Sequence, residues 1–452
     1  MQQLTLIVAV AAATMVVASR PLTGLIVYLA TLLFYPVFLT IPIGTADINP
    51  GRVVVALLLV KCLMNPRLKS AFKWRRLDTF VTIGVAVHVA VELLMQPSMS
   101  TVVNRAGYSL DTWFTYIAVR LCVTGHSECV RVCKALAIFV VPLALLGLVE
   151  TFTGWQPYLP LTQFCPWKPE LRLTEARSGL YRAVGPFAHP IMFGICFATF
   201  LPLVYWLRHE RNYWGKLAYA TSLAAVVGAL SSESSGPWMM VIVAVLWLAI
   251  EKRGHLVKPL IITFVVGCIL VAIISNRPFY HVIASYANPI GGSSWHRCKL
   301  IDCAIEDFGQ WYLVGYGGQD PGWGTALGMD HTDVTNEFIL AGVKYGILGV
   351  VTLILIFFAA FRGLIRLQKS AADAALKSFG WALGSSLVAL VFVFMSVSIF
   401  GQMSSLFYCL LGMVGSASCL GTANSLCVSP EHRLAAARIR SVALGASAQQ
   451  YS

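Results

Sequence analysis

The chain has 452 residues, of which 58% are hydrophobic and only 12% are charged. Soluble domains carry about 25% charged residues, so this chain has too few charges to cover the water-facing surface of a soluble protein of its length. The net charge of +13 would suggest a nucleic-acid partner in a soluble protein, but the sequence contains no nucleic-acid motif. Membrane proteins gather lysine and arginine in short cytoplasmic loops, which explains much of the excess.

Thirteen apolar segments are candidates for membrane helices, because a bilayer core of about 30 Å requires roughly 20 apolar residues in a helix. The expected spans are residues 4–18, 22–41, 53–64, 77–95, 110–123, 135–152, 191–207, 217–230, 238–250, 257–274, 338–361, 381–400 and 403–420. The first, third and fifth are short or polar for a full span, so twelve spans fit as well as thirteen. The first has no basic flank and is expected to be a retained span, not a cleaved signal. We therefore predict an all-α polytopic membrane protein.

Basic runs set the expected orientation. Lysine and arginine concentrate at residues 61–76, 208–216, 252–258 and 362–369, and these segments agree with one another if each lies in the cytoplasm. The side of the N-terminus stays open. This orientation gives N-terminal helices (1–153), a first outer loop (154–190), central helices (191–274), a large outer loop (275–336), C-terminal helices (337–424) and a cytoplasmic tail (425–452). The large loop is far longer than a simple connector, so we expect the functional chemistry in the two outer loops.

The first outer loop breaks the rule that positive charges stay in the cytoplasm. Arg182 precedes the segment 185–190 (Gly-Pro-Phe-Ala-His-Pro), which leads directly into a membrane helix, and Arg172 and Arg177 lie in the same loop. An arginine at the outer edge of the bilayer is unfavourable unless it snorkels or has an anionic partner. Two interpretations follow: Arg182 binds a phosphate-bearing ligand, or it anchors the loop to lipid head groups.

The large outer loop contains a second group of cations. Arg277 lies near its start, and Arg297 and Lys299 follow close together. Arginine binds a phosphate through two hydrogen bonds, and lysine adds a point charge. Apolar residues recur at helical spacing just after them, which predicts an amphipathic interfacial helix with Arg297 near its start; these residues are Leu300, Ile301, Ala304 and Ile305. A plain surface helix with solvated charges is the alternative.

Polar residues lead into the membrane helix of residues 338–361, in the order Asp-His-Thr-Asp-Val-Thr-Asn-Glu over positions 330–337. Ionisable groups at the mouth of a membrane helix are costly and are functional candidates for that reason. His331 and Thr335 are four residues apart and would share a helix face if the helix begins early. Asp333 could orient His331 or titrate itself. Helix N-capping by Asp333 or Thr335 is the structural alternative.

The pattern around Asn336 resembles the O-antigen ligase and O-antigen polymerase group of bacterial membrane glycosyltransferases. Many of those ligases carry His, then Asn, Ser or Gln, then nine residues, then Gly-x-x-Gly and Thr or Val. Here Asn336 is followed by nine residues and by the segment 346–350 (Gly-Ile-Leu-Gly-Val), so the spacing matches. Thr335 stands where the family has its His, and the nearest histidine is His331.

Three other stretches are similar to the family. Arg182 with the segment 185–190 resembles the Arg and Gly-aromatic-x-His-Pro pattern that opens a mid-chain helix. The segment 231–237 (Ser-Ser-Glu-Ser-Ser-Gly-Pro) resembles a short Ser-rich turn, although the usual Ser-Arg pair is missing. Arg297 is similar to the loop Arg that faces the lipid diphosphate. The resemblance thus extends over roughly residues 182–350.

The resemblance implies a GT-C-like glycosyltransferase of the bacterial inner membrane, with its active site facing the periplasm and short helices in the large loop. Such an enzyme moves a saccharide from a polyprenyl diphosphate, such as undecaprenyl diphosphate, to a hydroxyl of a glycan or lipid A core acceptor. It takes part in lipopolysaccharide or exopolysaccharide synthesis. A single displacement inverts the anomeric carbon. Cations can stabilise the charged leaving group, so neither a metal ion nor a cofactor is expected.

The resemblance and the residue chemistry together give the expected site. The residues expected to bind the donor diphosphate are Arg182, Arg297, Arg277 and Lys299. The catalytic candidates are His331, Asp333 and Thr335, with His331 the first choice of base because imidazole titrates near neutral pH. Further side chains expected to line the site are His189, His296, Asn336 and Glu337.

Two other functions fit the sequence. A transporter or flippase for a lipid-linked saccharide would need charged residues within the membrane, and the helices contain few, chiefly His88, Glu92, Arg120 and Lys344. A non-catalytic scaffold of a polysaccharide-export complex is the other. Ligase and polymerase, the sugar, the acceptor and the oligomeric state stay open, as does a disulfide among Cys165, Cys298 and Cys303.

Overall fold

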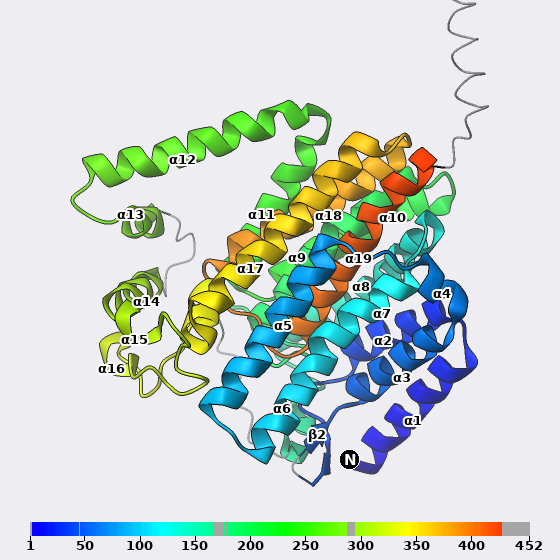
Figure 1. Ribbon diagram of the computed structural model, residues 1–452, viewed down its shortest axis with the longest axis horizontal. Coiled ribbons are helices and arrows are strands. Elements are labelled where there is room, and N and C mark those ends of the chain that lie inside the picture. Colours follow the sequence, from blue (N-terminus) through cyan, green and yellow to red (C-terminus); the bar gives the residue numbers. More distant parts are fainter. Residues whose placement is uncertain (1, 45, 166–175, 177–178, 287–293, 427–452) are drawn as a thin grey trace, which may run out of the picture.

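A computed structural model of the protein describes residues 2–44, 46–165, 176, 179–286 and 294–426 (Figure 1). In the first half of the chain the helices are α1 Gln2–Ala18, α2 Pro21–Phe34, α3 Pro50–Met64, α4 Pro66–Ala71, α5 Arg76–Met95, α6 Met99–Ser109, the π-helical turn Leu110–Phe114, α7 Thr115–Cys122, α8 His126–Thr153, the 3-10 turn Leu159–Phe164 and α9 Pro190–Trp206. They continue with the 3-10 turn Leu207–His209, α10 Tyr213–Leu230, α11 Ser235–Ala249, the 3-10 turn Glu251–Leu256, α12 Val257–Ile274, α13 Phe279–Tyr286, α14 Ser294–Glu306, α15 Phe308–Trp311, α16 Gly324–Leu327, α17 Glu337–Ser370, α18 Ala374–Phe394 and α19 Gln402–Leu426.

Each apolar segment predicted from the sequence coincides with helical structure. Among the described residues, seven helices are long and apolar enough to cross a bilayer, namely α5, α8, α9, α12, α17, α18 and α19. α1, α2 and α11 are apolar but shorter. The chain is thus a mostly helical membrane protein, as predicted, whereas the number of twelve or thirteen full crossings stays a prediction. Most of the predicted cytoplasmic tail, from residue 427 onward, lies outside the described residues.

The predicted span of residues 22–41 is wrong in its last third, because α2 ends at Phe34. Pro36 has no N–H to donate, and a residue that precedes a proline avoids the helical conformation. Tyr35 is accordingly extended, with φ −98° and ψ 124°. The helix therefore ends because of Pro36, although the apolar sequence continues to residue 41.

A small antiparallel hairpin follows, with β1 (Ile41–Ile43) paired to β2 (Ala46–Ile48). It is a local exception to the all-α prediction. The predicted span of residues 381–400 is also too long, because α18 ends at Phe394 and a loop follows it. Both corrections concern the same end of the bundle, where apolar sequence leaves helical geometry.

The helices form a bundle around a hydrophobic core (Figure 1). α9, α18 and α19 lie at its centre, and most of their residues are buried. α17 packs against α5, α18 and α19, and α19 also packs against α7. α1, α2 and α3 pack together on one flank, α8 and α10 pack against α9, and α8 also packs against α2. Aromatic side chains fill the core, including Trp206, Phe193, Phe379 and Phe394.

α12 stands apart from the bundle. No residue of this helix is buried, and in Figure 1 it runs away from the other helices towards α13. A helix that is apolar on every side and lacks protein cover requires lipid around it. α12 is therefore the most direct sign of a membrane environment in the fold.

The two ends of the bundle differ in charge, and we call them the basic end and, after the orientation predicted from the sequence, the outer end. The basic end contains the start of α5 and the last turns of α17, with Arg76, Arg362 and Arg366 around one hollow. Arg208 and Glu251 form an ion pair there, with Nη2 and Oε2 2.6 Å apart. The outer end carries the hairpin, α6, and the loops that precede α9, α17 and α19. The basic runs of the sequence thus gather at one end, which fits a common side of the membrane.

A buried ion pair holds the basic end together. Arg120 Nε lies 2.8 Å from Asp78 Oδ1, and both side chains are almost completely buried. Tyr116 donates a second hydrogen bond to the same carboxylate at 2.6 Å, and Arg120 also donates to the Lys73 carbonyl at 2.8 Å. The two charges compensate each other, as buried charges must. Arg120 is therefore a packing residue and lines no path through the membrane.

α17 is broken at Gly346, where φ is +68° and ψ is −166°. The glycine-rich loop of residues 312–318 docks into the break. Tyr316 N donates to the Val343 carbonyl at 2.6 Å, and Ile347 N donates to the Tyr312 carbonyl at 2.8 Å. Because a bilayer offers no hydrogen-bond partners, these bonds satisfy the backbone groups that the break leaves open. The first glycine of the Gly-x-x-Gly motif thus permits a backbone turn that other residues rarely adopt.

We expect Gly346→Ala to lower the melting temperature of the purified protein in detergent. A methyl group at position 346 would meet the Leu313 carbonyl oxygen and carbon, and a positive φ adds strain of about 1–3 kcal/mol. Gly267→Ala on α12 is the matched control, because nothing lies within 4 Å of its Cβ position. Equal melting temperatures for the two variants would contradict the docking of the loop at the break.

Candidate functional site

Glu150, near the end of α8, fixes the segment that carries Arg182. Its carboxylate Oε2 accepts hydrogen bonds from Val184 N at 2.7 Å and from Gly185 N at 2.9 Å. The side chain is completely buried, and its Oε1 has no hydrogen-bond partner among the described residues. A buried carboxylate that accepts two backbone hydrogen bonds holds this non-helical segment in one conformation.

Arg182 meets the Ser-rich turn between α10 and α11. Its Nη2 donates to Ser234 Oγ at 2.7 Å, and its Nε donates to the Ser232 carbonyl at 3.4 Å. Ala183 N donates to the Ser231 carbonyl at 2.9 Å. Glu233 in this turn is the only non-glycine residue of the described chain with a positive φ, at 45°. Two stretches that resemble the family in sequence therefore come together, and they hold the guanidinium half-buried at the outer end. Arg172 and Arg177 lie outside the described residues.

Asn336 and Glu337 hold the start of α17 to the loop between α18 and α19. Asn336 Oδ1 caps α17 by accepting from Phe338 N and Ile339 N, and its Nδ2 donates to the Met395 carbonyl at 2.8 Å. Glu337 Oε2 accepts from Ile399 N at 2.8 Å. Both side chains therefore use their polar atoms to fix backbone, which leaves them a positioning role at the outer end.

His189 has a similar role at the start of α9. Its Nδ1 accepts from Ile191 N at 3.1 Å, which makes it the N-cap of the helix. Its ring lies edge-on to Phe400, with centroids 6.0 Å apart. His189 thus joins the segment that carries Arg182 to the loop that Asn336 and Glu337 hold. The three residues surround one loop, residues 395–401.

The prediction that His331 and Thr335 share a helix face is wrong. α17 begins at Glu337, because the Asn336 side chain caps it and the Asn336 backbone is extended, with φ −133°. The alternative that Asp333 or Thr335 caps the helix is wrong for the same reason. His331 and Asp333 are exposed. Thr335 Oγ1 is buried and has no hydrogen-bond partner among the described residues.

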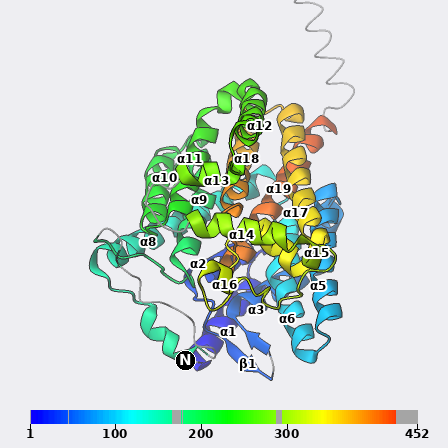
Figure 2. The same ribbon diagram turned by 90° about the vertical axis from the view of Figure 1, so that its left-hand side faces the viewer.

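The predicted helix with Arg297 near its start is confirmed as α14, which crosses one side of the bundle in Figure 2, whereas its place at the membrane interface stays a prediction. Leu300 and Ala304 are buried, as expected, but Ile305 is exposed and Cys303 is buried in its place. His296 and the Asp333 carbonyl lie within hydrogen-bond distance, 3.2 Å apart. This contact brings the first turn of α14, with Arg297 and Lys299, next to the segment that contains His331.

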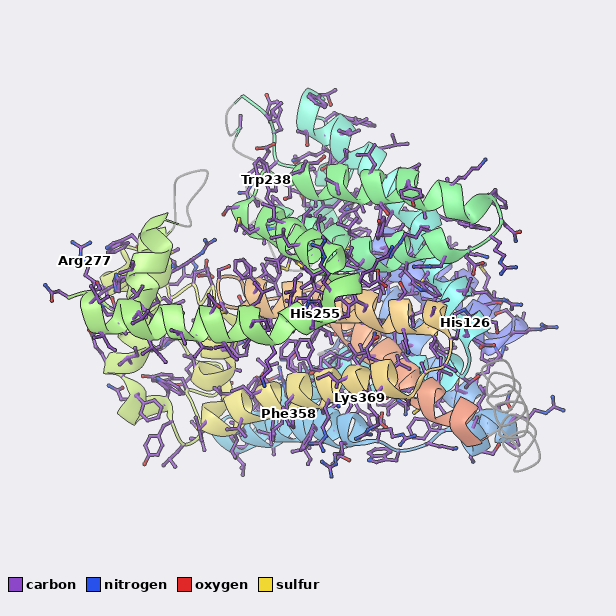
Figure 3. The ribbon with its side chains drawn as sticks, turned by 90° about the horizontal axis from the view of Figure 1, so that it is seen from above. His126, Trp238, His255, Arg277, Phe358 and Lys369 are labelled. Atoms are coloured by element: carbon purple, nitrogen blue, oxygen red, sulfur yellow. The ribbon has the colours of Figure 1, made fainter. Side chains whose placement is uncertain are left out.

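Arg277 does not join this group. It is exposed and lies at the edge of the molecule in Figure 3, where its side chain points outward. α13 follows Arg277 in the chain and contacts α14. The hydroxyl of Tyr280 on α13 donates a hydrogen bond to the Asp302 carboxylate on α14 at 2.8 Å. Burial and the hydrogen bond to the Asp302 carboxylate raise the pKa of Tyr280 to about 12, so this hydroxyl remains a donor at neutral pH. Of the predicted phosphate-binding residues, Arg297 and Lys299 therefore share one turn of helix, and Arg277 lies elsewhere.

Asp320 joins the loop that follows it to the segment of residues 331–333. Its carboxylate accepts from Gly322 N at 2.7 Å and from Thr332 N at 2.9 Å, with a further bond from Thr332 Oγ1. These hydrogen bonds from Thr332 and Gly322 lower the pKa of Asp320. The carboxylate therefore stays charged and fixes the backbone next to His331.

Sequence reasoning missed a polar cavity of about 220 Å³ at the outer end. Arg52 Nη2 lies 2.7 Å from Asp111 Oδ2 on its wall. Gln402, also on the wall, donates to the Pro186 carbonyl at 2.8 Å, so the cavity adjoins the segment that carries Arg182. The other polar or aromatic lining residues are Thr31, Tyr35, Asn49, Tyr108, Ser404 and Ser405. Arg52 breaks the positive-inside pattern just as Arg182 does, and that signal could have found it.

His88 and Glu92, which the sequence analysis names among the charged residues of the helices, belong to a group beside the break in α17. Arg105 pairs with Glu92 at 3.0 Å, and the Tyr345 hydroxyl donates to the same carboxylate at 3.2 Å. His88 stacks on Tyr345 with ring centroids 3.8 Å apart and lies 2.6 Å from the Tyr108 hydroxyl. His88 and Glu92 therefore both contact Tyr345, and the group holds this residue, which precedes Gly346.

Cys298 and Cys303 are free thiols in the structure, so neither forms a disulfide with the other or with Cys165. Burial, together with the Asp302 carboxylate, raises the pKa of Cys298, which keeps it protonated and unreactive.

Comparison of the chain with known family models and with curated protein sequences finds no match.

Removal of the Glu150 carboxylate is expected to loosen the segment that carries Arg182. Hydrogen bonds to a charged group contribute about 1.5–3 kcal/mol, so Glu150→Ala should speed amide exchange over residues 181–189 about tenfold or more. Glu150→Gln retains an acceptor oxygen and should exchange at close to the wild-type rate. Hydrogen–deuterium exchange with peptide mass spectrometry measures both. Wild-type exchange in Glu150→Ala would show that the carboxylate does not fix the segment.

Proposed function

We propose that this chain is a membrane glycosyltransferase that moves a saccharide from a polyprenyl diphosphate to an acceptor hydroxyl, as an O-antigen ligase or a polysaccharide polymerase does. The observation that carries the proposal is the environment of Arg182. Ser234 and Ser232 hold its guanidinium, and Glu150 holds the backbone just after it. A guanidinium fixed in advance stabilises charge on a departing diphosphate without reorganisation during the reaction.

Arg297 and Lys299 are proposed to complete the diphosphate site from α14. Their helix turn is tied through His296 to the segment that leads into α17, and that segment is in turn anchored beside His189. Cations from two separate loops suit a ligand with two phosphates. In this arrangement the anomeric carbon reacts as its bond to the diphosphate oxygen breaks, and the acceptor hydroxyl attacks from the opposite face.

His331 is proposed to take the proton from the acceptor hydroxyl. It is exposed, and Asp320 fixes the backbone of the following residue, Thr332. Asp333 is the alternative base, because it is exposed on the same segment. Thr335 stands where the family has its His, but its hydroxyl is buried and cannot reach a substrate without movement of the chain.

The proposed setting is the bacterial inner membrane, with Arg182 and residues 330–336 facing the periplasm. The gathering of basic runs at the opposite end supports this orientation. The partners are then a lipid-linked saccharide donor and a glycan or lipid A core acceptor, and the reaction needs no metal ion or cofactor. A polysaccharide-assembly complex is a further partner consistent with this role.

A transporter for a lipid-linked saccharide is the second candidate. The break in α17 at Gly346 and the buried group of Glu92, Arg105 and His88 beside it are features that transporters use. Glu92 and Arg105 neutralise each other as an ion pair, which favours a structural role over a transport path, whereas His88 Nε2 and Arg105 Nε are buried without a hydrogen-bond partner among the described residues.

We expect Arg182→Ala and Arg297→Ala each to lower turnover about 10²-fold or more, because a preorganised donor to a developing negative charge contributes about 10²–10³ in rate. The assay follows release of the lipid diphosphate from an undecaprenyl-diphosphate-linked oligosaccharide, with purified protein, acceptor and EDTA. Arg67→Ala, an exposed arginine at the basic end, is the control and should retain full activity.

A wild-type product yield in both arginine variants, at equal expression, would contradict the proposal that these arginines bind the diphosphate. No release by the wild-type protein with any acceptor, together with measurable binding of the lipid donor, would favour the transporter.

His331→Ala is expected to lower the rate by about 10²–10⁴, which is the usual contribution of a general base. Asp333→Asn is the comparison, because Asp333 is exposed on the same segment and should retain most of the activity if His331 is the base. Turnover of both variants in the assay of lipid diphosphate release tests this. Wild-type turnover in His331→Ala, together with a loss of turnover in Asp333→Asn, would transfer the role to Asp333.

A further inference from the structure

A hollow at the basic end lies between α5, α17 and α19, far along the chain from every residue of the proposed active site. Its volume is about 90 Å³, and one enclosed water needs only about 10–15 Å³ of such volume. Four arginines line it, two at the start of α5 and two on α17, namely Arg75, Arg76, Arg362 and Arg366. The hollow therefore has room for a group larger than a few waters and a strong preference for negative charge.

Three of the four arginines that line the hollow have no ion-pair partner among the described residues. None of the ion pairs in the described part of the chain involves Arg76, Arg362 or Arg366. The acidic residue in the first turn of α5 is Asp78, and its carboxylate already accepts hydrogen bonds from Arg120 and Tyr116. α17 has no acidic residue after Glu337, and α19 has none over its described length. Arg76, Arg362 and Arg366 thus bring positive charge to the hollow that no acidic side chain of the described residues pairs with.

Apolar side chains form the rest of the wall. Leu77, Phe80, Leu355 and Phe358 line the hollow together with the arginines. Phe358 is 55% exposed and lies on α17 one turn before Arg362; Figure 3 labels it, with Lys369 further along the same helix. α17 packs directly against α5, so the hollow is a site between two membrane helices, with cations at one side and exposed apolar surface at the other.

We propose that this hollow binds the phosphate of an anionic membrane phospholipid. Basic pockets between membrane helices recognise anionic head groups, and arginine pairs with phosphate through two parallel hydrogen bonds. The positive-inside rule explains why arginines lie at this end of the bundle. It does not explain why four of them converge on one hollow whose remaining wall is apolar, which is the combination that a head group with acyl chains requires. The inference does not depend on glycosyl transfer.

The test uses the purified full-length chain in detergent and native mass spectrometry of lipid binding. Phosphatidylglycerol and cardiolipin should bind and persist in the spectrum. Phosphatidylcholine, whose phosphate carries a compensating cation, should bind at least tenfold more weakly. Inorganic phosphate should not compete at the same concentration, because it lacks the acyl chains that the apolar wall would contact. Equal binding of phosphatidylcholine, or full competition by inorganic phosphate, would overturn the assignment to an anionic lipid.

Variants locate the site. Arg76→Gln combined with Arg362→Gln should weaken phosphatidylglycerol binding at least tenfold. The matched control is Arg67→Gln with Arg253→Gln, which removes two exposed arginines from the same end and should leave binding unchanged. An equal loss in the control pair, or wild-type binding in the test pair, would overturn the site. If the test pair does not purify, Arg366→Gln alone should still weaken binding severalfold, since its side chain is exposed; wild-type binding in that variant would overturn the site as well.

Discussion

The outer end of this bundle depends on one constraint: backbone that leaves helical geometry near the bilayer core must find its hydrogen-bond partners inside the protein. The break at Gly346 meets it with two bonds to the loop of residues 312–318. The segment before α9 meets it through the buried carboxylate of Glu150. In both places a loop far away in the sequence, or a single buried anion, takes the role that water has in a soluble protein.

The same bonds that satisfy this backbone also place the candidate site. Glu150 fixes the peptide groups just after Arg182, and the Ser-rich turn fixes its guanidinium. Asn336 and Glu337 fix the loop of residues 395–401, which His189 contacts from the other side. The residues that the sequence predicted for the site thus divide into those that hold backbone and those that face outward. That division follows from burial: a buried polar group is occupied by protein, whereas an exposed one is available to a substrate.

Composition and apolar runs were enough to predict the membrane-protein class and the positions of the helices, because the bilayer imposes one length and one polarity on every span. The end of α2 at Phe34 was missed because Pro36 acts inside an apolar run. The start of α17 was predicted within one residue, but its cap was missed because Asp333, Thr335 and Asn336 are all acceptable caps, and only the contact of Asn336 with Met395 selects one of them. Arg52 and Asp111 were missed because they are 59 residues apart, and no local pattern joins them.

Thr335 restricts what residues 330–336, the proposed catalytic segment, can do. A threonine hydroxyl has no basicity near neutral pH, and here its oxygen is buried behind the cap of α17. A base at that position would therefore have to act from inside the protein, where no acceptor could reach it. The polar groups that remain exposed lie two and four residues earlier, at Asp333 and His331, on a segment that Asp320 and His296 fix from two sides. If the chain transfers sugars, the proton of the acceptor hydroxyl must pass to a group on this segment. Because Thr335 stands where the resembling ligases carry their His, the base would then lie in the loop before α17 and not at the start of the helix.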